Sequence, residues 1–467
     1  MSELLFKNRI DAELYQPKLL ESYDEIQKLP WENKKLSQCC FIKSGTTPID
    51  RNDEEKKGAI LFKTTDIRNN VLLPSDDLYR ISEDIHKRMQ KTRLQKEDIL
   101  LNIVGASLSV IGRSSFVNSI LDDNEANITQ AMALLRNKTS DVLPGYLFAY
   151  LNTVYAQDQI KRYARPTGQY NLNLFEVGEI VIPIIPKELQ EQVAELVLDS
   201  EQKMNMSQNL YFEAEELLNQ QLKLDQIVGQ KKKYSETSFL NISKSHRLDA
   251  QHFQDKFADL INHLSNFSPR KVKDIALFNR RGVQPNYNSD GQIDVVNSQH
   301  IGKKHLKYDL LEKTSKEMFL KSPEGHIRKN DLLIYTTGAY IGRTNVFLEE
   351  KPALASNHVN ILRINPDFDP AYVGMILQSK IGRLQTEMHL RGSAQAELYS
   401  SDIEKFIIPM LPPDIQKNIG DLIRESKKIE SESKQLINDS SRLIESIIKK
   451  QHGKQSSLQK DLEYNKR

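Results

Sequence analysis

The sequence has very little cysteine and no long apolar run. Cys39 and Cys40 are the only cysteines among 467 residues, and they are adjacent. Neighbouring cysteines rarely form a useful cross-link and cannot supply four zinc ligands, so a disulfide framework and a cysteine-based zinc module are excluded. No apolar run approaches the roughly 20 residues of a membrane span, and the charged N-terminus does not resemble a signal peptide. We therefore expect an intracellular soluble protein.

Motifs that carry chemistry are also missing. The sequence contains no P-loop, no Gly-x-Gly-x-x-Gly after a strand, no His-Glu-x-x-His and no Gly-x-Ser-x-Gly. The Asn/Asp-Pro-Pro-Tyr/Phe signature of amino-methyltransferases is absent, because Asn365-Pro366 lacks a second proline. The ten histidines do not cluster at ligand spacing. A hydrolase or transferase needs a nucleophile or an acid–base set, so we predict no catalytic residue and no metal site.

An excess of charge of one sign is absent as well. Lys and Arg number 65 and Asp and Glu number 63, which gives a formal net charge of +2. This balance argues against a uniformly basic nucleic-acid coat and against an acidic solvating chain, but it permits local basic patches. With 39% hydrophobic and 27% charged residues, the composition is typical of a globular chain rather than a disordered one.

What the sequence does contain is an internal repeat. Arg9-Ile10-Asp11-Ala12 returns as Arg247-Leu248-Asp249-Ala250. The later matches keep the same order in both copies: Lys43-Ser44-Gly45 with Arg280-Arg281-Gly282, Lys96–Leu101 with Lys329–Ile334, Gly112-Arg113 with Gly342-Arg343, Arg165 and Gln169 with Arg391 and Gln395, and Ile182-Pro183 with Ile408-Pro409. One isolated match could be chance, but this ordered set indicates two tandem copies.

Each copy ends in a long amphipathic segment that opens after Pro186 or Pro412. Apolar residues recur there in steps of three and four, the seam pattern of a coiled coil, and serine takes the skipped seam positions 200, 207, 426 and 433. Each helix would be roughly 55 Å long. We predict that the two pair as an antiparallel coiled coil; the alternative is two separate helices, each packed on its own globular unit. The predicted seam residues are Leu189, Val193, Leu196, Leu210, Leu217, Ile415, Ile419, Leu422, Ile429, Leu436 and Leu443.

The predicted fold class is α+β, with two globular mixed α/β domains alternating with the two long helices. The boundaries are 1–186 for the first domain, 187–228 for the first helical spacer, 229–412 for the second domain, 413–450 for the second spacer and 451–467 for a polar tail that should fray. Strands are expected at 59–62, 99–104, 331–335 and 359–362, and helical stretches at 146–162 and 372–389.

Loops of both globular units are rich in residue types that bind DNA. Arg pairs with guanine and Asn or Gln with adenine, while Ser, Thr and Lys hold phosphates; the alternative is an ordinary solvated surface. The Arg–Gln elements that recur in both copies indicate a shared role, either phosphate clamping or core hydrogen bonding. The DNA-binding candidates are Lys63, Thr64, Thr65, Arg68, Asn69, Ser107, Ser109, Gln130, Arg165, Thr167, Gln169 and Tyr170 in the first unit, and Asn297, Ser298, Gln299, Lys303, Lys304, Tyr340, Asn357, His358, Arg391, Ser393 and Gln395 in the second.

The architecture resembles the specificity subunit of Type I restriction–modification systems, over almost the whole chain. The likeness rests on Ser44-Gly45-Thr46-Thr47-Pro48, where a target-recognition domain would begin, and on two junctions that each open a long helix. These junctions are Ile182-Pro183-Ile184-Ile185-Pro186 and Ile408-Pro409-Met410-Leu411-Pro412. Asn418 stands where the first copy has Gln192, a mild departure.

The resemblance implies that each globular unit is a target-recognition domain that reads one half of a bipartite, asymmetric double-stranded DNA site. The chain would be a non-catalytic antiviral-defence protein of a bacterial or archaeal cytoplasm, without a cofactor of its own. Its partners would be two methyltransferase (modification) subunits that bind S-adenosylmethionine and methylate adenine, and motor–nuclease restriction subunits that use ATP and Mg. Two alternatives stay open: a self-contained DNA adenine methyltransferase or endonuclease with a cryptic motif, and a coiled-coil scaffold that does not bind DNA.

Overall fold

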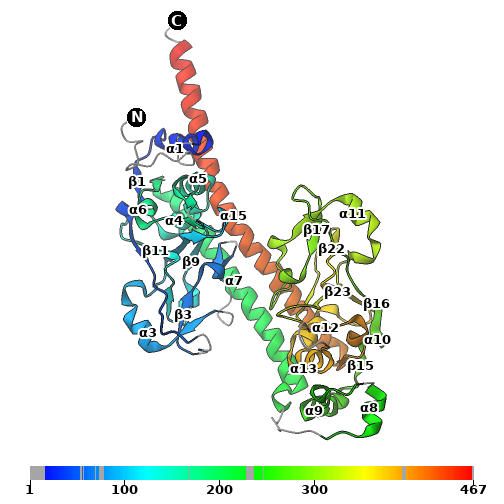
Figure 1. Cartoon of the computed structure of the whole chain (residues 1–467). Helices are drawn as coiled ribbons and strands as arrows, with labels where there is room; N and C mark the ends of the chain where they lie inside the picture. Colours follow the sequence, from blue (N-terminus) through cyan, green and yellow to red (C-terminus); the bar gives the residue numbers. More distant parts are fainter. Residues whose placement is uncertain are drawn as a thin grey trace. The chain divides into compact units, whose positions relative to one another are not determined.

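The chain divides into two compact units in a computed structural model (Figure 1). Unit 1 consists of residues 1–205 and 430–467, and unit 2 consists of residues 206–429. The structure describes residues 16–52, 55, 57–68, 70–72, 78–166, 168–227, 236–245, 247–391 and 396–464. Each unit contains one globular head and a part of each of two long helices, α7 (Lys187–Leu222) and α15 (Pro413–Tyr464). In the described part of the chain, no helix is long and apolar enough to cross a membrane.

The head of unit 1 is built on two small sheets. One is antiparallel, in the order β2 (Cys40–Ser44), β11 (Met132–Asn137), β7 (Asp98–Asn102) and β9 (Ser114–Val117). The other has the order β10 (Ala126–Ile128), β3 (Ala59–Phe62) and β6 (Arg80–Ile81), with β10 and β3 parallel. Strands β3 and β7 are buried along their whole length. A short continuous apolar run is the sequence pattern of such a strand, so the expected strands at 59–62 and 99–104 are confirmed in outline.

Shorter elements complete this head. They are α1 (Pro17–Gln27), β1 (Asn33–Lys35), α2 (Leu36–Cys39), β4 (Ile67–Arg68), β5 (Val71–Leu72), α3 (Glu83–Arg88), β8 (Val104–Gly105), α4 (Pro144–Leu151), α5 (Val154–Tyr163), β12 (Arg165–Pro166), β13 (Tyr170–Asn171), α6 (Leu174–Gly178) and β14 (Val181–Pro183). The helical stretch expected at 146–162 is two helices rather than one. Thr153 begins a new helix because its side chain accepts a hydrogen bond from the Ala156 amide.

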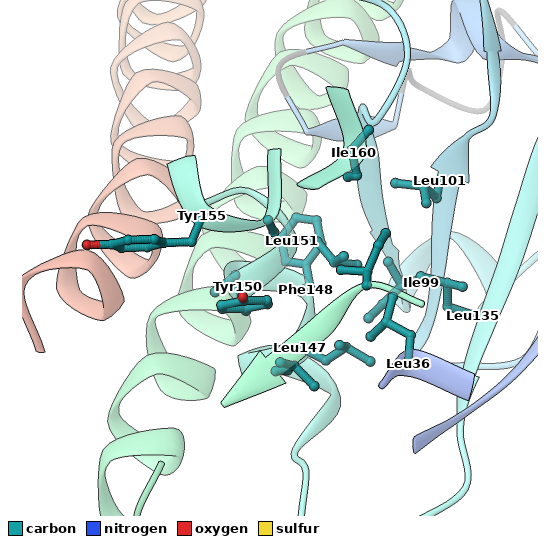
Figure 2. Packing of buried hydrophobic residues seen from close by; sticks show 14 of the residues in the cluster. Leu36, Ile99, Leu101, Leu135, Leu147, Phe148, Tyr150, Leu151, Tyr155 and Ile160 are labelled. Atoms are coloured by element: carbon teal, nitrogen blue, oxygen red, sulfur yellow. The ribbon is translucent and has the colours of Figure 1, made fainter. Parts of the chain in front are cut away.

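The core of unit 1 lies between the antiparallel sheet and helices α4 and α5. Figure 2 shows Leu147 and Phe148 packed toward Ile99 and Leu135 of the sheet, whereas Tyr155 projects toward α15. The same core contains Val193 and Val197 of α7 and Ile437, Ile444 and Ile448 of α15. The Glu445 carboxylate of α15 also accepts a hydrogen bond of 2.8 Å from the Val154 amide in the first turn of α5. Parts of both long helices therefore complete this head.

The head of unit 2 repeats the antiparallel sheet of the first, and its other sheet has one strand more among the described residues. Its antiparallel sheet has the order β16 (Ala276–Arg281), β23 (Val359–Ile364), β20 (Leu332–Tyr335) and β21 (Thr344–Val346). The other sheet has the order β18 (Glu312–Thr314), β17 (Ile293–Val296), β22 (Ala353–Ala355) and β19 (His326–Ile327), with β17 and β22 parallel. Strands β16, β23, β20 and β21 correspond to β2, β11, β7 and β9, which confirms the tandem repeat at the level of fold.

The remaining elements of unit 2 follow the same plan. They are α8 (Phe239–Ser245), α9 (Asp255–Leu264), β15 (Arg270–Lys271), α10 (Val272–Ile275), α11 (Lys316–Lys321), α12 (Pro370–Gln378), α13 (Lys380–His389), α14 (Ser400–Ile403) and β24 (Ile407–Ile408). The expected helix at 372–389 is interrupted at Ser379, whose hydroxyl accepts a hydrogen bond from the Ile381 amide and starts α13. The core packs Tyr372 and Ile376 against Tyr211 and Leu218 of α7 and Ile419 of α15.

The long helices bury a stripe that is offset from the predicted seam at several positions. Val193, Ile419 and Ile429 are buried as expected. Leu189, Leu196, Leu210, Leu217, Ile415, Leu422, Leu436 and Leu443 are half-buried, whereas the neighbouring Val197, Tyr211, Leu218, Ile423, Ile437 and Ile444 are buried. Where two adjacent residues at the edge of a heptad stripe are both apolar, the sequence pattern alone does not determine which of them is buried. Which of the two turns inward depends on the packing surface.

Serine occupies buried positions on both long helices, where the two backbones lie close together. In unit 1, Ser200 Oγ donates to the Ser433 carbonyl at 2.9 Å, and Ser433 Oγ donates to the Ser200 carbonyl at 2.7 Å. In unit 2, Ser207 Oγ donates to the Ser426 carbonyl at 2.7 Å, and Ser426 Oγ donates to the Ser207 carbonyl at 2.8 Å. Each buried hydroxyl thus finds a partner, as buried polar groups must.

The two long helices differ in length. Helix α7 has 36 residues and ends at Leu222, close to the expected boundary. Helix α15 has 52 residues and continues beyond Lys450 to Tyr464. Residues 451–464 of the expected polar tail therefore lie within helix α15, and the fraying of this tail stays a prediction. The sequence QHGKQSSLQKDLEY has few apolar residues to signal burial, but it lacks proline and therefore does not interrupt a helix already started.

Each head contains a buried aspartate at the start of one strand that pairs with an arginine of the neighbouring strand. The Arg363 guanidinium of β23 donates to both oxygens of Asp331, each at 2.7 Å, and the Asp331 side chain has no exposed surface. In unit 1, Arg136 of β11 holds the Asp98 carboxylate of β7 in the same way, at 2.8 and 2.7 Å. A buried carboxylate requires such a partner, so these arginines belong to the frame of the heads.

We predict that Arg363→Ala and Arg136→Ala each destabilise the protein by about 3 kcal/mol, because removal of one partner leaves a buried charge uncompensated. The free energy of unfolding should be measured by urea titration with wild-type chain alongside. Lys321→Ala is the control, since Lys321 pairs with Glu317 only on the exposed face of α11, and it should change little. If the free energy of unfolding of Arg363→Ala equals that of the control variant, the ion pair does not stabilise the head.

Candidate nucleic-acid interface

In unit 1, the ends of four strands bring three loops to one edge of the head. Strands β3 and β10 run parallel and end together at Phe62 and Ile128, and β7 ends at Asn102 opposite Met132 of β11. Loops 63–66, 103–113 and 129–131 leave from these points. The Thr129 amide donates to the Phe62 carbonyl at 3.0 Å, and the Asn102 side-chain amide donates to the Thr64 carbonyl at 3.0 Å. These bonds join the two sheets at the edge, which we call edge 1.

Edge 1 gathers most of the candidates predicted from the first copy. Lys63, Thr64, Thr65, Ser107, Ser109 and Gln130 all lie on its loops, and Thr65, Ser109 and Gln130 are exposed. The Lys63 ammonium lies 3.7 Å from the centre of the Tyr79 ring, and the Ser107 and Ser109 hydroxyls share a hydrogen bond of 2.8 Å. Tyr170 of β13 pairs with Gly105 of β8, which places strand β13 and the exposed Gln169 beside loop 103–113. Arg68 lies in β4, while Asn69 and Thr167 lie outside the described residues.

Unit 2 has the equivalent edge, which we call edge 2. Strands β17 and β22 end together at Val296 and Ala355, and β20 ends at Tyr335 opposite Val359 of β23. Loops 297–307, 336–343 and 356–358 meet there. The Ser356 amide donates to the Val296 carbonyl at 2.9 Å, and the Thr336 amide donates to the His358 carbonyl at 3.1 Å.

The candidates of the second copy gather on edge 2. Asn297, Ser298, Gln299, Tyr340, Asn357 and His358 lie on its loops, and Gln299, Tyr340 and His358 are exposed. Lys303 is exposed, whereas the Lys304 ammonium lies 5.4 Å from the centre of the Tyr211 ring of α7. Asn297 is turned inward, since its amide donates to Glu312 and its oxygen accepts from the Gln299 amide. Ser393 and Gln395 lie outside the described residues.

The recurring arginines are bound to buried carboxylates. Arg165 Nε donates to Glu176 at 2.9 Å, and Arg391 Nη2 donates to Asp402 at 2.7 Å. The Glu176 and Asp402 side chains are 1% and 0% exposed, while the arginines are 45% and 48% exposed. Of the two roles considered for these arginines, this geometry favours core hydrogen bonding. Each arginine covers a buried charge and keeps part of its side chain at the surface.

The Asp402 carboxylate is held ionised by its partners. Burial raises its pKa, but hydrogen bonds from Arg391 and Lys405 outweigh burial, and the pKa of Asp402 lies below its ordinary value of 3.8. Lys405 Nζ lies 2.9 Å from Asp402 Oδ1, the oxygen that also accepts the hydrogen bond from Arg391. Asp402 therefore anchors α14 to two cationic side chains.

Edge 2 also carries residues that sequence reasoning did not select. The Arg343 guanidinium lies 3.7 Å from the centre of the Tyr340 ring, and Tyr340 is 54% exposed. The Arg281 guanidinium lies 5.2 Å from the Tyr399 ring and donates to the Leu398 carbonyl at 3.0 Å. Arg281 and Arg343 appeared in the sequence as repeated residues, but their contacts with tyrosine rings could not be read there. Stacked Arg–Tyr pairs suit the recognition of phosphates and bases.

A cleft of about 990 Å³ lies beside Tyr340 in unit 2. Its head side contains Lys303, Arg343, Lys380 and Arg383, whereas its α7 side contains Glu215 and Glu216. The cleft therefore has a basic wall on the head and an acidic wall on α7.

Comparison with known proteins places this arrangement in a family. The family model described as the Type I restriction modification DNA specificity domain matches residues 28–215 and 265–439. The specificity subunit of the Type I restriction enzyme EcoBI from Escherichia coli is 26% identical over 149 residues, which is 32% of this chain and 30% of that subunit. The match therefore spans less than a third of that relative.

Two solved structures align with this chain over most of their length. The S subunit of a Type I restriction–modification system from M. genitalium has 12% identity and a TM-score of 0.41, over 91% of this chain and 96% of that one. The HsdS subunit from Thermoanaerobacter tengcongensis has 14% identity and a TM-score of 0.27, over 90% and 97% of the two chains.

The Asp402 site predicts a pH-dependent stability. A carboxylate whose pKa is lowered on folding contributes stability above its unfolded pKa, and this contribution is lost as the pH falls through the folded value. Asp402→Asn should therefore be less stable than wild type at pH 7, and the difference should shrink as the pH falls below 3.8. Urea unfolding at pH 7, 5 and 3 measures this difference, with Asp290→Asn as an exposed control. A difference that stays constant or widens in acid would contradict the assignment.

Proposed function

The chain belongs to the family of Type I restriction–modification DNA specificity domains, and we propose that it is the DNA-recognition subunit of such a system. Each head reads one half of a bipartite, asymmetric site on double-stranded DNA. The observation that carries this proposal is the pair of edges. Both present polar loops from equivalent strand ends, but edge 1 exposes Thr65, Ser109 and Gln130, whereas edge 2 exposes Gln299, Tyr340 and His358. Two readers with one frame and different surface residues select two different half-sites.

The two long helices form the antiparallel coiled coil that sets the gap between half-sites. The reciprocal hydrogen bonds of Ser200 with Ser433 and of Ser207 with Ser426 support this pairing. The two serine pairs correspond to each other in the repeat, as a pseudo-two-fold axis between antiparallel helices requires. A helix of 36 residues is about 54 Å long, which exceeds the 34–36 Å or so between successive major grooves.

The chain selects the site and its partners carry out the chemistry. Two methyltransferase subunits that bind S-adenosylmethionine dock on the two halves of the pseudo-symmetric chain, and restriction subunits that use ATP and Mg join them. The tandem repeat supports this assembly, because it offers one surface twice to two copies of one partner. The purified chain with S-adenosylmethionine and DNA should show no methyl transfer unless the methyltransferase subunit is added.

Exchange of one head tests the proposal directly. A chain in which residues 1–180 are replaced by the corresponding head of another family member should, with its methyltransferase partner, modify a site in which one half is new and the other unchanged. Sequencing of methylated adenines in genomic DNA measures both halves. The reverse exchange, of residues 250–408, is the matched control and should change the opposite half. A change in both halves, or in neither, would disprove the division of labour between the heads.

Lengthening the helices tests the coiled coil. Seven residues inserted after Asn205 and seven after Ile429 keep the heptad phase and add about 10 Å. The gap in the methylated site should grow by roughly three base pairs, at about 3.4 Å each, while both halves stay the same. Two residues inserted at each position are the control, since they rotate the helical faces by about 200° and should abolish methylation. An unchanged gap after the heptad insertion would rule out the spacer role.

A further inference from the structure

One loop is closed in the same way in both heads. In unit 1 the Asn102 amide donates to the Arg113 carbonyl at 2.8 Å, and the Gly112 amide donates to the Asn102 carbonyl at 2.9 Å. In unit 2 the Tyr335 amide donates to the Arg343 carbonyl at 2.9 Å, and the Gly342 amide donates to the Tyr335 carbonyl at 2.8 Å. We call the enclosed residues, 103–111 and 336–341, the tip loops. The two tip loops differ in length, but the same pair of backbone hydrogen bonds closes the base of each.

The end of each tip loop is anchored by a glycine. Gly112 and Gly342 have φ angles of 79° and 88°, a region that other residues rarely adopt. A Cβ atom on Gly112 would lie 2.8 Å from the Ile160 side chain of α5, and one on Gly342 would lie 2.3 Å from the Thr386 side chain of α13. Backbone conformation and space therefore both require glycine, and the loop end lies directly on the helix behind it.

The arginine that follows this glycine contacts the tip loop and stabilises its conformation. In unit 1 the Arg113 Nε donates to the Ser109 carbonyl at 2.7 Å. In unit 2 the Arg343 guanidinium stacks on the Tyr340 ring. The same residue of the repeat thus supports the tip in both heads, by a hydrogen bond in one and by stacking in the other. A braced loop loses less conformational entropy when it binds a ligand.

Each braced tip exposes one large apolar side chain on an otherwise polar edge. Leu108 is 38% exposed between the Ser107 and Ser109 hydroxyls, and Tyr340 is 54% exposed on the same edge as Gln299 and His358. A single exposed apolar residue is ordinary on a protein surface. Here it recurs at the tip of the same anchored loop in both copies, while its identity differs between them. Two DNA-recognition domains that share a fold but bind different half-sites are expected to keep the loop anchor and to differ in the exposed residue.

We propose that Leu108 and Tyr340 are specificity residues that contact base-pair edges, one in each half-site, through an apolar contact matched to the 5-methyl group of thymine. This inference rests on the proposed function of the chain. Hydroxyl and amide groups beside each tip can bond phosphates and polar base edges, whereas the thymine methyl is the apolar feature that the major groove presents. Arg113 and Arg343 are positioning residues, since they act through the tip.

The test uses the full chain in complex with its methyltransferase subunits. Tyr340→Ala should relax the sequence preference at one position of the half-site read by unit 2 and leave the other half unchanged, and Leu108→Ala should do the converse. Sequencing of methylated adenines shows both halves. Tyr340→Leu should retain an apolar contact and most of the preference. Leu320→Ala, on the exposed face of α11, is the control and should leave both halves as in wild type.

A second measurement probes the contact chemically. Thymine at the relaxed position is replaced by uracil, which removes only the methyl group. The wild-type complex should bind this oligonucleotide about fourfold more weakly, as expected for loss of one buried methyl, whereas the Tyr340→Ala complex should bind both oligonucleotides equally. If the wild-type complex recognises no bipartite site, the proposed function fails. If it does, and both alanine variants keep the wild-type preference at every position, the tip contact is refuted and the proposed function stands.

Discussion

The structure depends on the burial of the apolar stripes of two long helices. A helix of 36 or 52 residues with a continuous apolar stripe is not stable alone in water and must pack that stripe on something. In unit 1, α7 contributes Val193 and Val197 to the core and α15 contributes Ile444 and Ile448. In unit 2, α7 contributes Tyr211 and Leu218 and α15 contributes Ile419 and Ile423. Each head is therefore completed by both helices, and neither copy of the repeat forms a full unit from its own residues.

This constraint divides the repeated residues into a frame and a surface. The frame is the same in both heads: a buried carboxylate paired with an arginine of the next strand, an arginine over a second buried carboxylate, and a glycine seated on a helix. Its carboxylates are buried, as Asp331 is beside Arg363, and its glycines have no room for a side chain, as Gly342 has none beside Thr386. The loops that leave the frame at edge 1 and edge 2 carry different residues. One fold presented twice with two surfaces agrees with the proposed reading of an asymmetric bipartite DNA site.

The near-neutral composition agrees with such a division. Helix α7 carries many acids, among them Glu213, Glu215 and Glu216, while cationic side chains such as Lys303 and Arg343 stand on the heads. The formal net charge of +2 is thus the sum of an acidic segment in α7 and of basic side chains on the heads. Because cationic residues hardly outnumber acidic ones over the whole chain, its affinity for DNA of random sequence should be weak.

The sequence by itself determined the tandem repeat, the mixed α/β heads, the two long helices and the absence of known catalytic motifs, because these are properties of local pattern. Most of the DNA-binding candidates that it named lie on or beside edge 1 and edge 2. Only the tertiary structure decided which loops meet, because Thr64 and Asn102, or Val296 and Ser356, come together through strand pairing between distant segments. The same holds for Arg165 on Glu176, for the choice of Val197 over Leu196 in the buried stripe, and for the breaks at Thr153 and Ser379. In each case a packing surface or a single hydrogen bond selects between options that the sequence pattern leaves nearly equal.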